Sequence, residues 1–157
     1  MTHKYEHQTV AVAWVLVADR GRAQILAADL PDAARLEIVE TLVHPASTVH
    51  ARDIETDGPG SFQDRGGQSH AGDPETDFRH QTAQQFAGQI VERLEKGRLT
   101  NAFGKLIVVA PPLFLGVLRD KLPAPLSQLV AHEIGKDLTR QSERELRDRL
   151  VAANAFA

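Results

Sequence analysis

Residues 10–28 read VAVAWVLVADRGRAQILAA, and this stretch decides the fold. Its first nine residues are apolar and rich in β-branched side chains, which is typical of a buried β-strand. Residues 19–22 form a polar break in which Gly21 can adopt a positive φ without steric cost, so we expect a tight turn there. Residues 23–28 then return as the second strand of an antiparallel hairpin.

A third strand and a long helix follow the hairpin. Residues 35–43 alternate imperfectly between apolar and polar side chains, which predicts a third, antiparallel strand near one edge of the sheet. We expect a helix with Asp73 as its N-cap, Pro74 at its first position, an apolar side chain every fourth residue and an end at Gly97. Residues 106–110 (LIVVA) are wholly apolar, as in a central strand covered on both faces.

Prolines bound the next helix. Pro111 and Pro112 open it and Pro123 stops it, because proline suits a first helical turn and cannot continue a helix. Residues 129–134 then fit either a last strand or the end of a helix that begins at Pro125.

The end of the chain carries a helix signal. Ser142 and Glu145 have the spacing of a capping box, which predicts a last helix over 143–153. The expected order is therefore βββ-α-β-α-β-α, an α/β fold with a mixed sheet and helices on both faces. This order is similar to the ribonuclease-H-like topology, which many unrelated functions share.

The composition describes one domain over residues 1–157. Apolar residues make up 42% and charged residues 25%, as in soluble globular proteins. Cysteine is absent, which excludes disulfides and thiolate nucleophiles and suits the reducing cytoplasm. No signal peptide or membrane span is expected, since the longest apolar run is about half of what a bilayer requires. The net charge of −3 gives no global attraction for nucleic acid but is compatible with a local basic patch.

Residues 44–75 form a long polar connection that is the most informative feature of the chain. They are rich in Gly, Asp, Ser, Gln, His and Arg and contain almost nothing apolar. A connection of this length inside a compact domain is usually either functional or disordered. We therefore expect a functional or flexible loop here.

Metal-dependent functions have partial support. A ribonuclease-H-type nuclease needs carboxylates at the ends of two strands and on the first helix. Asp19 closes the first strand, but Ala110 and Pro111 stand where the second strand should supply a ligand. The histidines and aspartates of the loop offer ligands for zinc or iron, but no two histidines have a helical metal-binding spacing. We assign no metal and no cofactor, and a small metal-dependent hydrolase stays a third alternative.

One tripeptide in the loop offers chemistry of its own. Gly66 and Gly67 free the backbone to approach a substrate closely, and Gln68 then offers a side-chain amide beside its own N–H.

The chain resembles the bacterial host-attachment protein family across nearly its whole length. Members of this family are described as required for attachment to host cells. The resemblance lies in TVAVAWVLVADRGRAQIL, in GDPETD at the end of the loop, in FGKLIVVAPPLFLGVLRDKL and in EIGKDLT. This resemblance implies no particular reaction, ligand or cofactor.

The chain is also similar to the middle domain of archaeal and eukaryotic peptide-chain release factors. In that domain a Gly-Gly-Gln loop follows the strand meander and precedes a long helix, as RGGQS does here. The glutamine there helps to position the water that attacks the peptidyl-tRNA ester. The resemblance implies that Gln68 is catalytic, that Gly66 and Gly67 permit close backbone approach, and that Arg65 contacts RNA phosphate.

These observations lead to a first hypothesis and an alternative. The first is a cytoplasmic module associated with the ribosome or tRNA, acting in ribosome rescue, hibernation or peptide release and linked only indirectly to host attachment. Its binding residues would be Arg52, Arg65, His70 and Arg79. The alternative is a non-enzymatic binding protein whose loop recognises a protein partner or a small anion, with His50, Arg52, His70 and Arg79 as contact residues.

Overall fold

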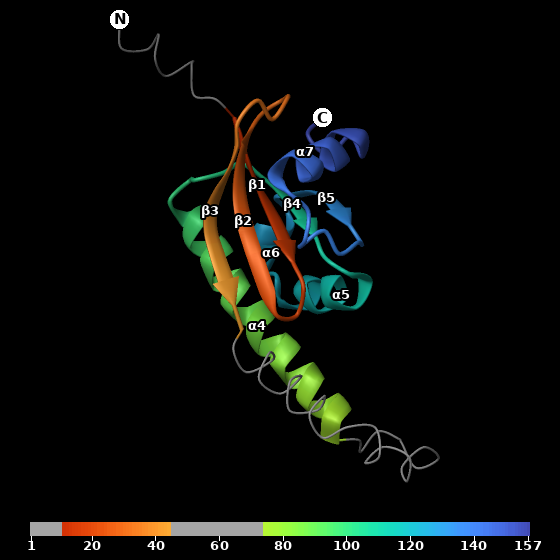
Figure 1. The fold of residues 1–157 in the computed structure, drawn as a ribbon. Coiled ribbons are helices and arrows are strands. Elements are labelled where there is room, and N and C mark those ends of the chain that lie inside the picture. The colour runs from red at the N-terminus through yellow and green to blue at the C-terminus, as the bar shows by residue number, and fades with distance from the viewer. Residues whose placement is uncertain (1–10, 45–73) are drawn as a thin grey trace, which may run out of the picture.

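The computed structural model describes residues 11–44 and 74–157, and its centre is a five-stranded sheet with helices on both sides (Figure 1). The strands lie in the order β3-β2-β1-β4-β5. Their bounds are β1 (Val12–Ala18), β2 (Arg22–Asp29), β3 (Leu36–Val43), β4 (Lys105–Val109) and β5 (Val130–Ile134). The helices are α4 (Pro74–Leu99), α5 (Pro112–Lys121), α6 (Ala124–Ser127) and α7 (Glu143–Ala152). The predicted mixed α/β architecture is confirmed.

The alternatives for residues 129–134 are resolved as a strand. A single helical turn, α6, begins just after Pro123, and the chain then enters β5. β5 pairs in parallel with β4, and β4 pairs in parallel with β1. The carboxyl ends of these three strands therefore lie together at one end of the sheet, along the edge that runs across the strand ends.

The hairpin and the third strand form the antiparallel half of the sheet. β1 pairs with β2 and β2 pairs with β3, which lies at the edge as predicted. The register shifts so that Glu40 lies opposite Ile25 while Ile38 lies opposite Leu26. Val39 is thus the extra residue of a β-bulge, a device common on edge strands. This bulge explains the imperfect alternation of the sequence.

The sheet separates two apolar cores. Trp14 and Leu16 of β1 point into a core that α4, α5 and α6 cover. Val15 and Val17 point to the opposite face, which α7 covers. β4 alternates in the same way, so the strand LIVVA is buried on both faces as its composition predicts.

α4 packs through the predicted apolar stripe, but its C-terminal end differs from the prediction. Gly97 does not end the helix, which continues to Leu99. A Cβ at Gly97 would lie 2.4 Å from the Trp14 ring, so glycine is required by close packing. Asn101, with φ of 56°, closes the helix instead, and the amides of Asn101 and Ala102 donate to carbonyls of the last turn. The predicted N-cap Asp73 lies outside the described residues.

The predicted capping box of the last helix is present. The Ser142 hydroxyl accepts a hydrogen bond from the Glu145 amide (3.1 Å), and the Glu145 carboxylate accepts one from the Ser142 amide (3.0 Å). These bonds lower the pKa of Glu145 below its ordinary value. The helix buries Leu146 and Leu150 against the second face of the sheet.

Candidate functional site

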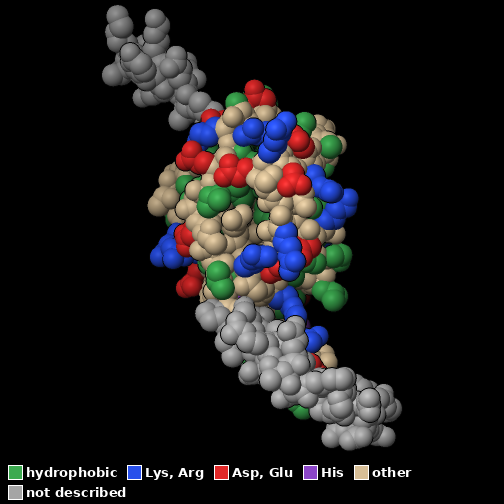
Figure 2. Space-filling view, viewed as in Figure 1, with side chains coloured by type: hydrophobic (Ala, Val, Ile, Leu, Met, Phe, Trp, Pro, Cys, Tyr) green, Lys and Arg blue, Asp and Glu red, His purple; other side chains and the backbone are tan. Residues whose placement is uncertain are grey.

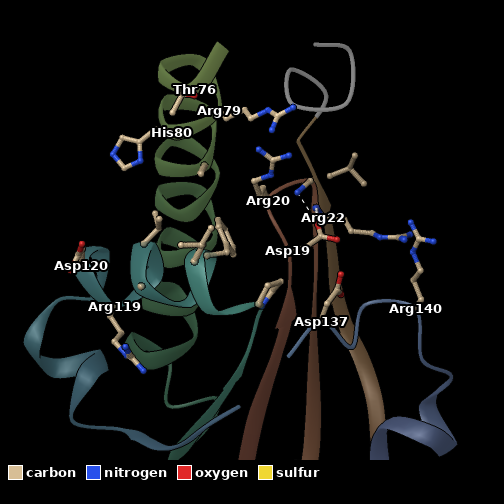
Figure 3. A pocket seen from close by; sticks show the side chains of 18 residues that line it. Asp19, Arg20, Arg22, Thr76, Arg79, His80, Arg119, Asp120, Asp137 and Arg140 are labelled. Carbon is tan, nitrogen blue, oxygen red and sulfur yellow. Dashed lines mark hydrogen bonds between the residues drawn. The ribbon is translucent and has the colours of Figure 1, made fainter. Parts of the chain in front are cut away.

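A pocket of about 1420 Å³ lies at the edge where β1, β4 and β5 end (Figure 3). Its walls come from the β1–β2 turn, the end of β3, the start of α4, α5 and the segment between β5 and α7. Ligands of open α/β sheets bind outside the carboxyl ends of the parallel strands, which is this edge. We call it the basic pocket, because five arginines and three aspartates line it. They are Arg20, Arg22, Arg79, Arg119, Arg140, Asp19, Asp120 and Asp137.

The charge of the basic pocket differs from that of the whole chain. Its five arginines and three aspartates give a formal charge of +2, whereas the chain carries −3. Figure 2 shows Lys and Arg side chains on the lower part of the visible face, the region where Figure 1 places the β1–β2 turn. Because Glu75 and Glu133 pair with Arg79 and Arg119, the attraction for anions comes from the remaining arginines, Arg20, Arg22 and Arg140.

Two arginines of the basic pocket already have carboxylate partners. Arg79 lies 3.3 Å from Glu75, and Arg119 lies 2.7 Å from Glu133. The hydrogen bond from the Arg119 Nε to Glu133 (2.9 Å) raises the pKa of the guanidinium above its ordinary value.

The other three arginines have no such partner. In the part of the chain that the structure describes, no carboxylate lies within 4.0 Å of the guanidinium of Arg20, Arg22 or Arg140. In Figure 3 the Arg22 and Arg140 side chains point toward one another, and Arg20 points toward Arg79. Like charges gathered in this way favour an anion between them.

Asp19 holds the rim of the basic pocket together. One of its carboxylate oxygens accepts hydrogen bonds from the backbone amides of Gly21 (2.8 Å) and Arg22 (2.9 Å), which fixes the β1–β2 turn. The other lies 3.3 Å from the Thr139 hydroxyl, whose single proton is shared between Asp19 and the nearer Asp137 (2.6 Å). The carboxylate considered above as a nuclease ligand thus joins the turn to the segment that carries Arg140.

Part of the wall is apolar and open to solvent. Leu113 has 89% of its surface exposed and Val43 has 59%, and both line the basic pocket. Pro111 and Val117 continue this surface along α5. The pocket therefore offers aliphatic side chains among its guanidinium groups.

Of the predicted site residues, the structure places only Arg79. Its side chain lines the basic pocket from α4. The others lie outside the described residues. They are His50, Arg52, Arg65, Gly66, Gly67, Gln68 and His70.

The described residues that flank the segment 45–73 lie beside the basic pocket. The His44 amide donates to the carbonyl of Gly21 (2.9 Å), and the His44 ring packs edge-on against Phe86 at 5.3 Å. On the other flank, Thr76 lines the pocket from the first turn of α4. The polar connection thus leaves and rejoins the described structure at this edge.

Sequence reasoning missed four arginines of the basic pocket: Arg20, Arg22, Arg119 and Arg140. The first two flank Gly21 in the turn predicted at the end of the first strand, so the sequence could have indicated that they lie at this end of the sheet. Arg119 and Arg140 belong to elements more than ninety residues away in the chain, and only the topology brings them to the same edge.

Within residues 11–44 and 74–157, no group of three or more His, Cys, Asp or Glu side chains is placed to hold a metal ion. Over the same residues, no helix has the length and apolar character needed to cross a membrane.

Sequence comparison identifies one family and one relative. The model of a family described as "Protein required for attachment to host cells" matches residues 14–150. The uncharacterized protein RP470 of Rickettsia prowazekii (strain Madrid E) is 31% identical over 72 residues, which are 45% of this chain and 48% of that protein. The chain therefore aligns with about half the length of this relative.

Solved structures show where else the fold occurs. Dom34 of S. cerevisiae, a translation termination-like factor involved in RNA quality control pathways, is similar over 98% of this chain and 38% of its own, with 10% identity and a TM-score of 0.50. The archaeal translation termination factor aRF1 is similar over 92% of this chain and 38% of its own, with 16% identity and a TM-score of 0.44. An archaeal actin homolog, Ta0583, is similar over 94% of this chain and 50% of its own, with 16% identity and a TM-score of 0.48. At these identities the likeness concerns the fold.

Proposed function

The chain belongs to the family of proteins required for attachment to host cells, and from this premise we propose that it is a cytoplasmic module that binds tRNA or the ribosome. The observation that carries the proposal is the basic pocket, whose five arginines gather at the carboxyl ends of the parallel strands. The RNA backbone would lie against this pocket. The attachment phenotype of the family would then follow indirectly from altered protein synthesis.

The physical support is the contrast between local and global charge. A protein with a net charge of −3 is repelled by RNA as a whole and needs a defined positive surface to bind it. Arginine suits this role because its planar guanidinium donates paired hydrogen bonds to phosphate. Arg20, Arg22 and Arg140 have these donors free of carboxylate partners in the described part of the chain.

The place of the polar connection also supports the proposal. Its described flanks, His44 and Thr76, lie beside the basic pocket, so the segment that contains Gln68 is joined to the described structure there. We propose that Gln68 positions a water molecule for hydrolysis of a peptidyl-tRNA ester, while Gly66 and Gly67 admit the substrate. The Dom34 fold is compatible with such a role, although one fold serves many functions.

Co-sedimentation with bacterial ribosomes through sucrose, at low and moderate salt, tests the proposal. We expect the full chain to sediment with ribosomes, and the variant Arg20→Ala/Arg22→Ala to stay at the top of the gradient. The variant Lys105→Ala/Arg149→Ala is a matched control, because it removes the same charge from exposed sites away from the basic pocket. A wild-type chain found only at the top at both salt concentrations would refute ribosome binding, and a chain that also fails to bind bulk tRNA would refute the whole proposal.

A separate assay tests the hydrolytic step. We expect Gln68→Ala to keep ribosome binding and to lose release of the peptide from peptidyl-tRNA on the ribosome. A Gln68→Ala chain that hydrolyses peptidyl-tRNA as fast as the wild type would remove the catalytic assignment and leave the binding assignment standing.

The edge strand β3 favours a non-enzymatic protein-binding module as the second candidate, with β3 as its binding surface in place of the 44–75 loop. Ile38 and Val39 are 44% and 46% exposed, and they stand on a strand whose outer edge has no neighbour in the described part of the sheet. Exposed apolar side chains on an edge strand are typical of surfaces that pair with another chain. If the alternative is correct, Ile38→Lys will abolish capture of a protein partner while the arginine variants retain it.

A further inference from the structure

We infer that two copies of the chain associate through their β3 strands, which pair antiparallel about a two-fold axis between Val39 and Glu40. The described five-stranded sheets of the two copies then join into one continuous sheet. This inference goes beyond the proposed function, because it does not involve the arginines of the basic pocket. It names the occupant of the outer edge of β3 as a second copy of this chain.

Exposed apolar side chains gather on β3. Within residues 11–44 and 74–157, six large apolar side chains are exposed, and three of them belong to this strand. Ile38 is 44% exposed, Val39 is 46% exposed and Val43 is 59% exposed. β3 is also the outermost strand of the described sheet, so one row of its backbone N–H and C=O groups faces no neighbouring strand there (Figure 1). An edge strand of this kind is a template for pairing with another chain.

The first half of β3 alternates between the two faces of the sheet. Leu36 and Ile38 lie opposite β2 residues of the core that α7 covers, so both point to this face, which we call the α7 face. Glu37 lies opposite Ala27, which belongs to the core under α4, and points to that side, the α4 face. The α7 face thus carries the apolar side chains of this half.

The second half of β3 carries the same pattern in reverse order because of the bulge. Glu40 forms an ion pair with Arg93 of α4 (2.9 Å), and Leu42 packs against the core on the same side. These two side chains point to the α4 face, so Thr41 and Val43 point to the α7 face. Read from either end toward its midpoint, β3 therefore presents the same succession of faces.

This symmetry fixes the register between the two copies. With the axis between residues 39 and 40, Ile38 of one copy lies opposite Thr41 of the other on the α7 face. Leu36 likewise lies opposite Val43 of the other copy. A strand without a bulge can pair along β3 only by leaving one residue unmatched, as β2 does, whereas a second β3 matches both halves. The strand therefore fits a second copy better than it fits a regular strand of another protein.

The charges on β3 favour the same register. Its two acidic side chains already have arginine partners, since Glu37 lies 3.2 Å from Arg35 and Glu40 lies 2.9 Å from Arg93. In this register Glu37 lies opposite Leu42 of the other copy, so no carboxylate stands directly opposite a carboxylate. A slip of two residues in one direction would set Glu37 opposite Glu40, and like charges in that position repel. A slip of one residue would set side chains of the two copies on opposite faces.

Light scattering after size-exclusion chromatography of the full chain tests the association. We expect a mass close to twice the 17.2 kDa of one chain at high protein concentration, with a fall toward the mass of one chain on dilution. The mass of one chain at every concentration would overturn the inference.

Cysteine crosslinking tests the register, because the chain has no cysteine of its own. In Ile38→Cys/Thr41→Cys the two substituted positions face one another across the axis, with Cα atoms roughly 4.5–5.5 Å apart, a separation that a disulfide spans. Within one chain the same positions are about 10 Å apart along the strand, which is too far for a disulfide. We expect a covalent dimer on oxidation of this variant.

The matched controls for crosslinking are Ile38→Cys and Thr41→Cys alone. In each of them the cysteine faces a residue of another type in the second copy, so we expect no covalent dimer. A wild-type dimer whose double-cysteine variant fails to crosslink contradicts the pairing, and so does equal crosslinking of the single and double variants.

Two charged variants that differ at one position test the same contact without oxidation. Ile38→Lys/Thr41→Lys sets lysine opposite lysine and should give the mass of one chain, whereas Ile38→Lys/Thr41→Glu sets lysine opposite glutamate and should keep the dimer. Both side chains are exposed in the single chain, and circular dichroism checks that both variants fold. Equal masses for the two variants would refute the register.

Discussion

Replacement of Gly97 by alanine tests how closely α4 packs against the sheet. Gly97 lies in the last turn of α4, and its Cα faces the rings of Trp14 and Phe103. An added Cβ would stand 2.4 and 2.5 Å from two atoms of the Trp14 ring and 3.0 Å from the Phe103 ring. The two rings stack with centroids 4.6 Å apart, and Trp14 is only 9% exposed, so neither ring can move aside freely.

Two opposing effects set the magnitude. Alanine in a helix interior is favoured over glycine by about 1 kcal/mol. Overpacking of a filled core costs about 1–3 kcal/mol, and contacts this short place Gly97→Ala at the upper end of that range. We therefore expect a net loss of about 2 kcal/mol, which lowers the melting temperature of a domain of this size by about 4–8 °C.

Gly88 provides the matched control on the same helix. No atom lies within 4 Å of a Cβ placed there, so Gly88→Ala gains the helical preference without a clash and should be stabilised by up to about 1 kcal/mol. Urea unfolding followed by tryptophan fluorescence measures both variants, and Trp14 is the single tryptophan of the chain. A Gly97→Ala chain as stable as Gly88→Ala would refute the packing of α4 on Trp14.

Three further predictions concern surface elements. Ser142→Ala removes the cap of α7 and should lower the free energy of unfolding by about 1 kcal/mol in urea titrations. The lowered pKa of Glu145 means that its contribution to stability is present at neutral pH and is lost as the pH falls below the ordinary carboxyl value; the stability difference from Glu145→Gln should therefore shrink in acid, and a constant difference would contradict the capping box. Glu40→Ala breaks the ion pair with Arg93 (2.9 Å) on the surface and should change the melting temperature little, since such pairs contribute at most about 1 kcal/mol.

Most of the fold could be predicted because its signals are local. The hairpin, the apolar stripe of α4 and the capping box at Ser142 each depend on side chains within a few residues of one another. The features that could not be predicted depend on distant partners. Gly97 resembles a helix stop until Trp14, more than eighty residues earlier, is placed against it. The bulge at Val39 likewise depends on the strand beside it.

In the candidate site too, features with a local sequence signal could be predicted and features that depend on distant residues could not. The sequence indicates a polar connection with Gln68 and predicts binding by Arg79, and the structure places Arg79 on the basic pocket. Arg140 has no local signal, because its role arises only when the parallel strands bring its segment beside the β1–β2 turn. The fold brings separate segments of the chain together at this pocket. The spacing of residues in the sequence cannot predict such a surface.

Ultraviolet crosslinking of the full chain to RNA, with identification of the crosslinked residues by mass spectrometry, tests the RNA-binding surface most directly. Ribosomes and bulk tRNA are the two RNA samples, and Lys105→Ala/Arg149→Ala is the control chain. We predict crosslinks at the residues of the basic pocket, in 19–22, 111–117 and 137–140, and their loss in Arg22→Ala/Arg140→Ala. Crosslinks confined to α7 or to the outer edge of β3, or an absence of crosslinks to either RNA, would contradict RNA binding at this pocket.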